Sequence, residues 1–73
     1  MQLKEKLETL IRLHSLIDQR ATGDSIQLAR RLNVSKSTLF RYLNELRNFG
    51  APIAFCTEER HYFYEEEFEL QFI

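Results

Sequence analysis

The sequence predicts an α+β fold in which three helices precede a β-hairpin. Residues 2–48 carry leucine and isoleucine at spacings of three and four, a pattern that is typical of helices with one apolar side. After Pro52 the pattern changes to short, aromatic-rich runs, which are typical of strands. A chain of 73 residues builds a modest core, so we expect residues 1–73 to form a single domain.

The first helix is expected over residues 2–20. Its apolar stripe is formed by residues at helical spacing, namely Leu3, Leu7, Leu10, Ile11, His14 and Ile17. The segment 21–23 ends this helix, because Gly23 is free to adopt a positive φ. Within the stripe, His14 is expected to be a partly buried packing residue.

The second helix is expected over residues 25–32. Asp24 and Gln27 stand three positions apart and have the spacing of a capping box at its start. Asn33 follows the helix and tolerates the left-handed conformation that a tight turn requires. The apolar residues of this helix are Ile26, Leu28, Ala29 and Leu32.

The third helix is expected over residues 36–48. Ser35 precedes it as an N-cap, and Gly50 and Pro52 end it. Its apolar side is formed by Leu39, Leu43 and Leu46. Together with the second helix and a turn of about three residues, it forms a helix-turn-helix unit.

The hairpin is expected over residues 53–65, with residues 57–60 as a four-residue turn. One face of the hairpin is expected to cover the helices, and it consists of Ile53, Phe55, Tyr62 and Tyr64. A further strand is predicted over residues 67–73, where polar residues alternate with Phe68, Leu70 and Phe72.

Charge is unevenly distributed along the chain. The total is −1, but residues 25–50 carry a net charge of +4 and residues 51–73 carry −5. A basic face, rather than a basic total, is typical of nucleic-acid-binding domains. No apolar run approaches the roughly 20 residues that span a bilayer, and the charged N-terminus differs from a signal peptide. We therefore expect a cytoplasmic protein that does not enter membranes.

The stretch SIQLARRLNVSKSTLFRYLNELRNFGAPI, residues 25–53, resembles winged helix-turn-helix domains of the DeoR-type and WYL-associated kind. The shared features are Leu28-Ala29, Leu32, Val34-Ser35, Thr38, Arg41, Leu43, Leu46, Gly50 and Ala51-Pro52-Ile53. The resemblance covers about residues 3–65 and extends to small stand-alone bacterial proteins that end soon after the wing. It implies a DNA-binding bacterial transcriptional regulator, without the ligand-sensing domain of longer relatives and hence without a small-molecule effector.

The exposed side of the third helix is expected to read double-stranded DNA. In such units the N-terminal half of this helix enters the major groove. The residues expected to face base pairs lie in one broad arc, namely Lys36, Ser37, Phe40, Arg41 and Asn44. Ser35 lies where backbone amides favour a phosphate, and Thr38 is expected to be a second phosphate contact or a packing residue. Contacts with the DNA backbone are expected from Arg30, Arg31 and Arg47.

Several of these residues have a second interpretation. Arg30 and Arg31 could form a solvated helix face. Phe40 could pack partly against the core instead of contacting a base, and Tyr42 could either pack or hydrogen-bond to a phosphate. At the wing tip, the sequence Glu58-Glu59-Arg60 is acidic where related wings are often basic or rich in glycine, which predicts poor contact between wing and phosphate.

The expected partners are double-stranded DNA and a second copy of the chain. One recognition helix reads too few base pairs to find a site in a genome, so a homodimer on a palindrome is expected. Its interface would be the C-terminal strand or the exposed part of the first helix. The competing function is a winged-helix module that docks a protein partner through its acidic, aromatic C-terminal region.

Enzymatic, cofactor-dependent and metal-binding roles are not expected. A chain this short has no room for an enclosed substrate pocket, and its single cysteine excludes an internal disulfide. Cys56 and His61 lack the further ligands of a metal site and the activating base of a nucleophile. The run 65–67 is expected to be either a solvated turn or a group that repels DNA from that side.

Overall fold

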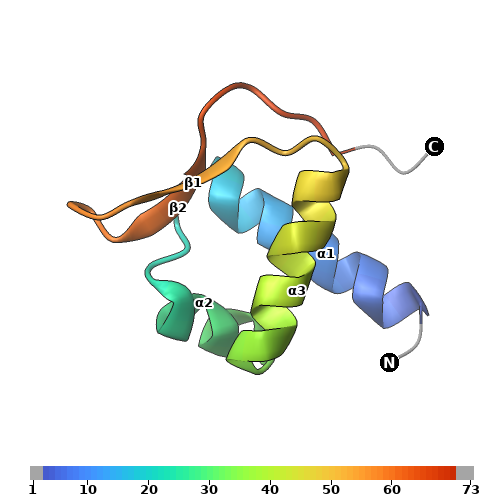
Figure 1. Ribbon diagram of the computed structural model, residues 1–73. Helices are drawn as coiled ribbons and strands as arrows, with labels where there is room; N and C mark the ends of the chain where they lie inside the picture. Colours follow the sequence, from blue (N-terminus) through green and yellow to red (C-terminus); the bar gives the residue numbers. More distant parts are fainter. Residues whose placement is uncertain (1–2, 71–73) are drawn as a thin grey trace.

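The computed structural model describes residues 3–70 and has the predicted α+β order, three helices followed by an antiparallel hairpin (Figure 1). Its elements are α1 (Leu3–Asp18), α2 (Ser25–Leu32), α3 (Lys36–Asn48), β1 (Ile53–Cys56) and β2 (His61–Tyr64). In Figure 1, α1 lies behind α3, α2 lies to the left of the lower end of α3, and the hairpin, called the wing below, extends to the left. None of the described helices is long and apolar enough to cross a membrane.

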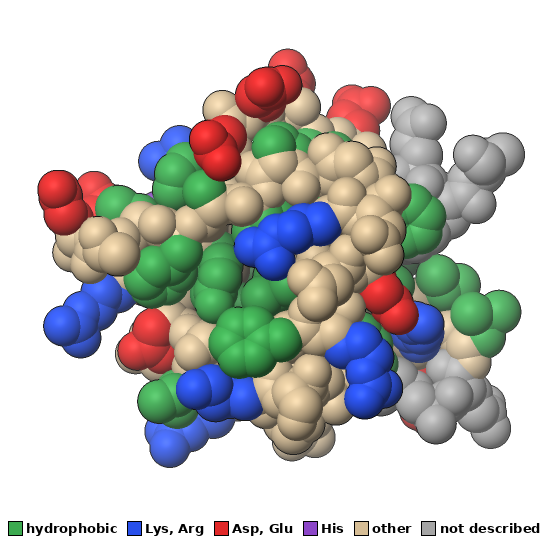
Figure 2. Space-filling view, in the orientation of Figure 1, with side chains coloured by type: hydrophobic (Ala, Val, Ile, Leu, Met, Phe, Trp, Pro, Cys, Tyr) green, Lys and Arg blue, Asp and Glu red, His purple; other side chains and the backbone are tan. Residues whose placement is uncertain are grey.

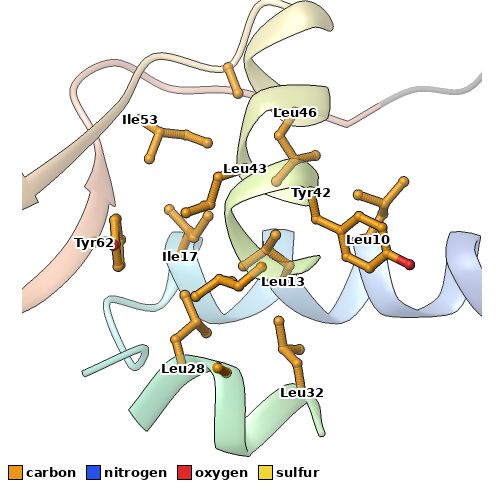
Figure 3. Packing of buried hydrophobic residues seen from close by; sticks show 13 residues of the cluster. Leu10, Leu13, Ile17, Leu28, Leu32, Tyr42, Leu43, Leu46, Ile53 and Tyr62 are labelled. Carbon is orange, nitrogen blue, oxygen red and sulfur yellow. The ribbon is translucent and has the colours of Figure 1, made fainter. Parts of the chain in front are cut away.

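The core lies where the three helices meet the base of the wing (Figure 3). Its members are Leu10, Leu13, Ile17, Leu28, Ala29, Leu32, Leu39, Tyr42, Leu43, Leu46, Ala51, Ile53 and Tyr62. The predicted apolar sides of α2 and α3 are confirmed, except that Ile26 is half exposed. Tyr42 is buried within this cluster, so its packing interpretation is confirmed.

The apolar side of α1 differs from the predicted stripe. Leu10, Leu13 and Ile17 are buried, whereas Leu3 and Ile11 are exposed. Successive residues of a helix point about 100° apart, so Ile11 points about 140° away from the centre of a buried face formed by Leu13 and Ile17. Leu3 is exposed because the first turns of α1 extend beyond the core (Figure 1).

The end of α1 also differs from the prediction, whereas the start of α2 confirms it. The helix ends at Asp18 and the chain leaves it through Arg20, which has a left-handed φ of 55°. Gly23 has the expected positive φ of 68°, but its place is the turn into α2. There, Asp24 and Gln27 form both hydrogen bonds of a capping box.

The turn between α2 and α3 follows the local sequence signals. Asn33 adopts the left-handed conformation, with φ 57° and ψ 46°. Ser35 caps α3, because its Oγ accepts a hydrogen bond from the backbone amide of Thr38 at 3.2 Å. At the other end of α3, Gly50 has a φ of 98° and turns the chain toward β1.

The wing has the predicted turn, and its predicted inward face is confirmed for Ile53, Tyr62 and Tyr64 but not for Phe55. Ile53 pairs with Tyr64 and Phe55 pairs with Tyr62, which places these four side chains on one face of the hairpin. Ile53 and Tyr62 are buried and Tyr64 is half-buried. Phe55 is 39% exposed and packs edge-on against Tyr62, with ring centroids 4.9 Å apart.

The predicted C-terminal strand is wrong over residues 67–70, which form no strand, and the remainder of that prediction, including Phe72, lies outside the described residues. Phe68 and Leu70 instead pack against the core. The ring of Phe68 lies 5.8 Å from that of His14 and 5.2 Å from that of Tyr64. These aromatic contacts direct the segment across α1, away from the edge of the wing.

Candidate nucleic-acid interface

The outer face of α3 brings together the side chains that were predicted to read bases. All five are exposed, namely Lys36, Ser37, Phe40, Arg41 and Asn44. Because α3 buries its leucines at positions 39, 43 and 46, the helical period places Ser37, Arg41 and Asn44 on the opposite side, toward solvent. Lys36 and Phe40 lie at the border between the two sides and are also exposed. Figure 2 shows this side of the molecule, where basic side chains spread over α2 and α3 with hydrophobic groups between them.

The start of α3 is held by two hydroxyl groups. Besides accepting the Thr38 amide, the hydroxyl of Ser35 donates a hydrogen bond to Oγ1 of Thr38 at 3.0 Å. Both side chains therefore stabilise the helix start, and Thr38 is half-buried. The first turn of a helix offers backbone amides and a positive dipole end to an anion, so a phosphate here would be bound mainly by the backbone.

Lys36 and Phe40 form a contact one helical turn apart. The Nζ of Lys36 lies 5.9 Å from the centroid of the Phe40 ring, within the range of a cation–π interaction. The ring is 44% exposed. Phe40 thus belongs mainly to the surface of α3 rather than to the core.

The predicted backbone-binding arginines lie at the borders of this face. Arg30, Arg31 and Arg47 are exposed, and Arg47 donates a hydrogen bond to Oδ1 of Asn44 at 3.5 Å. A further cation comes from α1, where the Arg12 guanidinium donates to the backbone oxygen of Arg31 at 3.0 Å. Sequence reasoning missed Arg12, because its contact spans 19 positions and leaves no local signal.

Glu45 is the acidic residue of the basic stretch 25–50, and it lies one helical turn after Arg41, on the side of α3 that is next to Lys6 of α1. Its carboxylate binds Nζ of Lys6 on α1 at 2.8 Å, and the residue is half-buried. The ion pair neutralises this carboxylate on the side of α3 that faces α1. The outer face therefore keeps its positive character.

One carboxylate of the acidic wing tip contacts a histidine that the sequence did not single out for this role. His61 is buried, and its Nε2 lies 2.9 Å from a carboxylate oxygen of Glu59. Its Nδ1 lies 3.2 Å from the backbone oxygen of Tyr62. Both partners are acceptors, so which of them receives an imidazole N–H depends on the tautomer of the ring.

Cys56 lies across from His61 in the register of the wing. Its Sγ accepts a hydrogen bond from the backbone amide of Glu59 at 3.5 Å, which ties it to the turn. Within residues 3–70, no group of three or more His, Cys, Asp or Glu side chains is arranged to hold a metal ion.

Thr22 anchors the wing to the loop between α1 and α2. Its side chain is fully buried, and Oγ1 accepts the backbone amide of Tyr62 at 2.8 Å while the hydroxyl donates to the Gly23 oxygen at 2.8 Å. Burial raises the pKa of the Tyr62 hydroxyl, an effect that nearby Arg47 opposes and Asp24 reinforces. Thr22 thus holds β2 against the loop before α2. Sequence reasoning missed Thr22 because its partner lies 40 residues away.

His14 anchors the other side of the wing. Its Nδ1 lies 2.8 Å from the hydroxyl of Tyr64, and the two rings are 5.5 Å apart. Burial raises the pKa of the Tyr64 hydroxyl, and Asp18 adds to this effect. The prediction that His14 is a partly buried packing residue is confirmed.

A comparison with family models, with curated proteins and with solved structures finds no match for this chain. The likeness to winged helix-turn-helix regulators therefore stays a prediction from the sequence, and a functional assignment depends on the face just described.

Proposed function

We propose that this protein binds double-stranded DNA sequence-specifically through α3 and acts as a bacterial transcriptional regulator. The observation that carries the proposal is the outer face of α3, where exposed polar and basic side chains share one arc: Lys36, Ser37, Arg41 and Asn44. A single helix fits the major groove of B-DNA, which is about 12 Å wide. The capped start of α3, with its backbone amides, suits a phosphate at the groove edge.

The chemistry of these side chains gives each of them a role. Lys36 and Arg41 can donate to the O6 and N7 atoms of guanine, and Asn44 can pair with adenine. Arg30 and Arg31, on the last turn of α2, would contact phosphates on one border of the groove. Several phosphate contacts would make the affinity strongly dependent on salt, because each contact releases counterions from the DNA.

The proposal is tested by binding the purified protein to a pool of random duplexes, at low and at physiological salt, followed by sequencing of the retained DNA. An enriched sequence that survives physiological salt is the expected result. Lys36→Ala should weaken binding to that sequence by about 5- to 100-fold, as expected for a lost base contact. Lys4→Ala is the matched control, because it removes the same charge from an exposed position on α1. Equal effects of the two variants would contradict a reading role for α3.

We further propose that the DNA-binding form is a homodimer, because one helix contacts too few base pairs for a unique site. Phe68 and Leu70 pack against the core, which leaves α1 as the better candidate for the interface. An apolar groove lies between the first turns of α1 and the end of α3, with exposed Leu3 and Phe49 at its margins. Light scattering should give a dimer at high micromolar concentration and a monomer for Leu3→Glu.

The competing proposal is a protein-docking module that uses the C-terminal region. The exposed carboxylates of residues 65–67 and Glu69 favour it, since they could bind a basic partner. The aromatic residues of this region support the proposal less, because Phe68 packs against His14 and Tyr64. A duplex pool that yields no enriched sequence at physiological salt would make this the better proposal.

A further inference from the structure

The contact between Lys36 and Phe40 carries a more specific inference about the DNA, which rests on the proposed function. The two residues are four positions apart on the outer face of α3, where side chains at this spacing are neighbours. The ammonium group lies 5.9 Å from the ring centroid. Attraction to the ring favours this position of the long lysine side chain, so less rotamer freedom is lost when it binds a base.

Phe40 differs from the other exposed aromatic rings by its surroundings. An isolated exposed phenylalanine needs no functional explanation. The ring of Phe40, however, lies within the arc of Lys36, Ser37, Arg41 and Asn44, which are all exposed. If α3 enters the major groove with this arc facing the bases, the ring lies against base edges.

The chemistry of the groove decides what this pair can read. The C5-methyl group of thymine is the apolar feature of the major groove, and aromatic side chains contact it, whereas lysine donates to guanine O6 and N7. Successive base pairs are about 3.4 Å apart, so groups separated by 5.9 Å reach base pairs one or two steps from each other.

We propose that Lys36 and Phe40 act as one reading unit for a C5-methylated pyrimidine that lies one or two base pairs from a guanine. Phe40 covers the methyl group, and Lys36 donates to the guanine. The same methyl group occurs on thymine and on 5-methylcytosine, so Phe40 would accept either base and reject uracil and unmethylated cytosine at this position.

The test changes the DNA and leaves the protein intact. The site enriched from the random pool is resynthesised with uracil in place of each thymine in turn, which removes one methyl group and nothing else. At one position near a guanine, the wild-type protein should lose about three- to tenfold in affinity, the effect of leaving one methyl group uncovered. Cytosine at that position should bind as weakly as uracil, and 5-methylcytosine should restore binding.

Two variants assign the effect to the ring. Phe40→Ala should bind the thymine and uracil duplexes equally well. Phe55→Ala should retain the difference, since Phe55 is a similarly exposed phenylalanine (39%) that lies on β1, outside the arc of α3 and outside the proposed dimer groove. The Lys36→Ala variant should no longer lose affinity when the neighbouring guanine of the DNA is replaced by 7-deazaguanine, which lacks N7.

The outcomes separate this inference from the proposed function. An enriched sequence that tolerates uracil at every position, or a uracil effect that persists in Phe40→Ala, would overturn the reading unit while DNA recognition by α3 stands. A pool from which nothing is enriched would overturn both.

Discussion

Replacing Thr22 by valine removes one hydroxyl group and keeps the shape of the side chain. In the wild type, this fully buried hydroxyl accepts the Tyr62 amide and donates to the Gly23 oxygen, both at 2.8 Å. The first bond joins the loop before α2 to β2. The variant leaves the Tyr62 amide in the interior without its acceptor.

The cost of Thr22→Val follows from these two bonds. A buried amide that loses its partner costs about 1–3 kcal/mol, and the second bond contributes about 1 kcal/mol. The extra methyl group of valine offsets part of this, so we expect a loss of about 2–3 kcal/mol in the free energy of unfolding. The total free energy of unfolding of a domain of this length is about 4–11 kcal/mol. The corresponding decrease in Tm is about 10–20 °C.

Urea unfolding, followed by circular dichroism, measures the loss, and hydrogen exchange of the Tyr62 amide locates it. Thr22→Ser keeps the hydroxyl, so its loss in the free energy of unfolding should be less than half of the loss caused by Thr22→Val. Thr57→Val, at an exposed position of the wing turn, should change stability by less than about 0.5 kcal/mol. If Thr22→Val costs no more than Thr57→Val, and the Tyr62 amide stays protected, the anchoring role of Thr22 is refuted.

Three further predictions follow from single features of the molecule. Arg41→Ala should weaken binding to the selected duplex by at least fivefold with unchanged unfolding in urea, and an unchanged affinity would exclude a DNA contact by Arg41. Gly23→Ala should cost about 1–2 kcal/mol, since its φ of 68° strains an L-residue and its Cβ would collide with the capping-box side chain; equal stability by urea titration would contradict this. Burial raises the pKa of Tyr64 above the ordinary 10, so the folded state keeps the phenol proton to a higher pH than the unfolded state. The free energy of unfolding should therefore fall as pH rises above about 10. Unfolding curves at alkaline pH should show a smaller fall for Tyr64→Phe.

Local structure was predictable where one or two neighbouring residues decide the backbone. The capping box at the start of α2, the left-handed Asn33 and the Ser35 cap of α3 were all read from residue types at fixed spacings. The two caps depend on hydrogen bonds between residues three positions apart, and Asn33 depends on the tolerance of asparagine for the left-handed conformation. The same local signals predicted the outer arc of α3, because its opposite side is filled by leucines.

The predictions that failed depended on contacts between distant segments. The stripe of α1 was misjudged because Ile11 and Leu13 are both apolar, and only packing against α2 and α3 selects Leu13. The alternation after residue 66 suggested a strand, but Phe68 finds aromatic partners in His14 and Tyr64 instead. Alternation alone therefore could not distinguish a strand from a segment that packs across a helix.

The sequence by itself determined the order of the elements, the caps of α2 and α3, and the exposed arc that we propose to read DNA. These features arise from helical period, residue shape and hydrogen bonds within one turn. Only the tertiary structure decided that Thr22 holds the wing, that Glu59 is bound by His61 and that Glu45 is neutralised by Lys6. Packing of the helices against the wing is needed to bring Thr22 to Tyr62 and Lys6 to Glu45, and the turn conformation is needed to bring Glu59 onto His61. None of these contacts has a signature in sequence spacing.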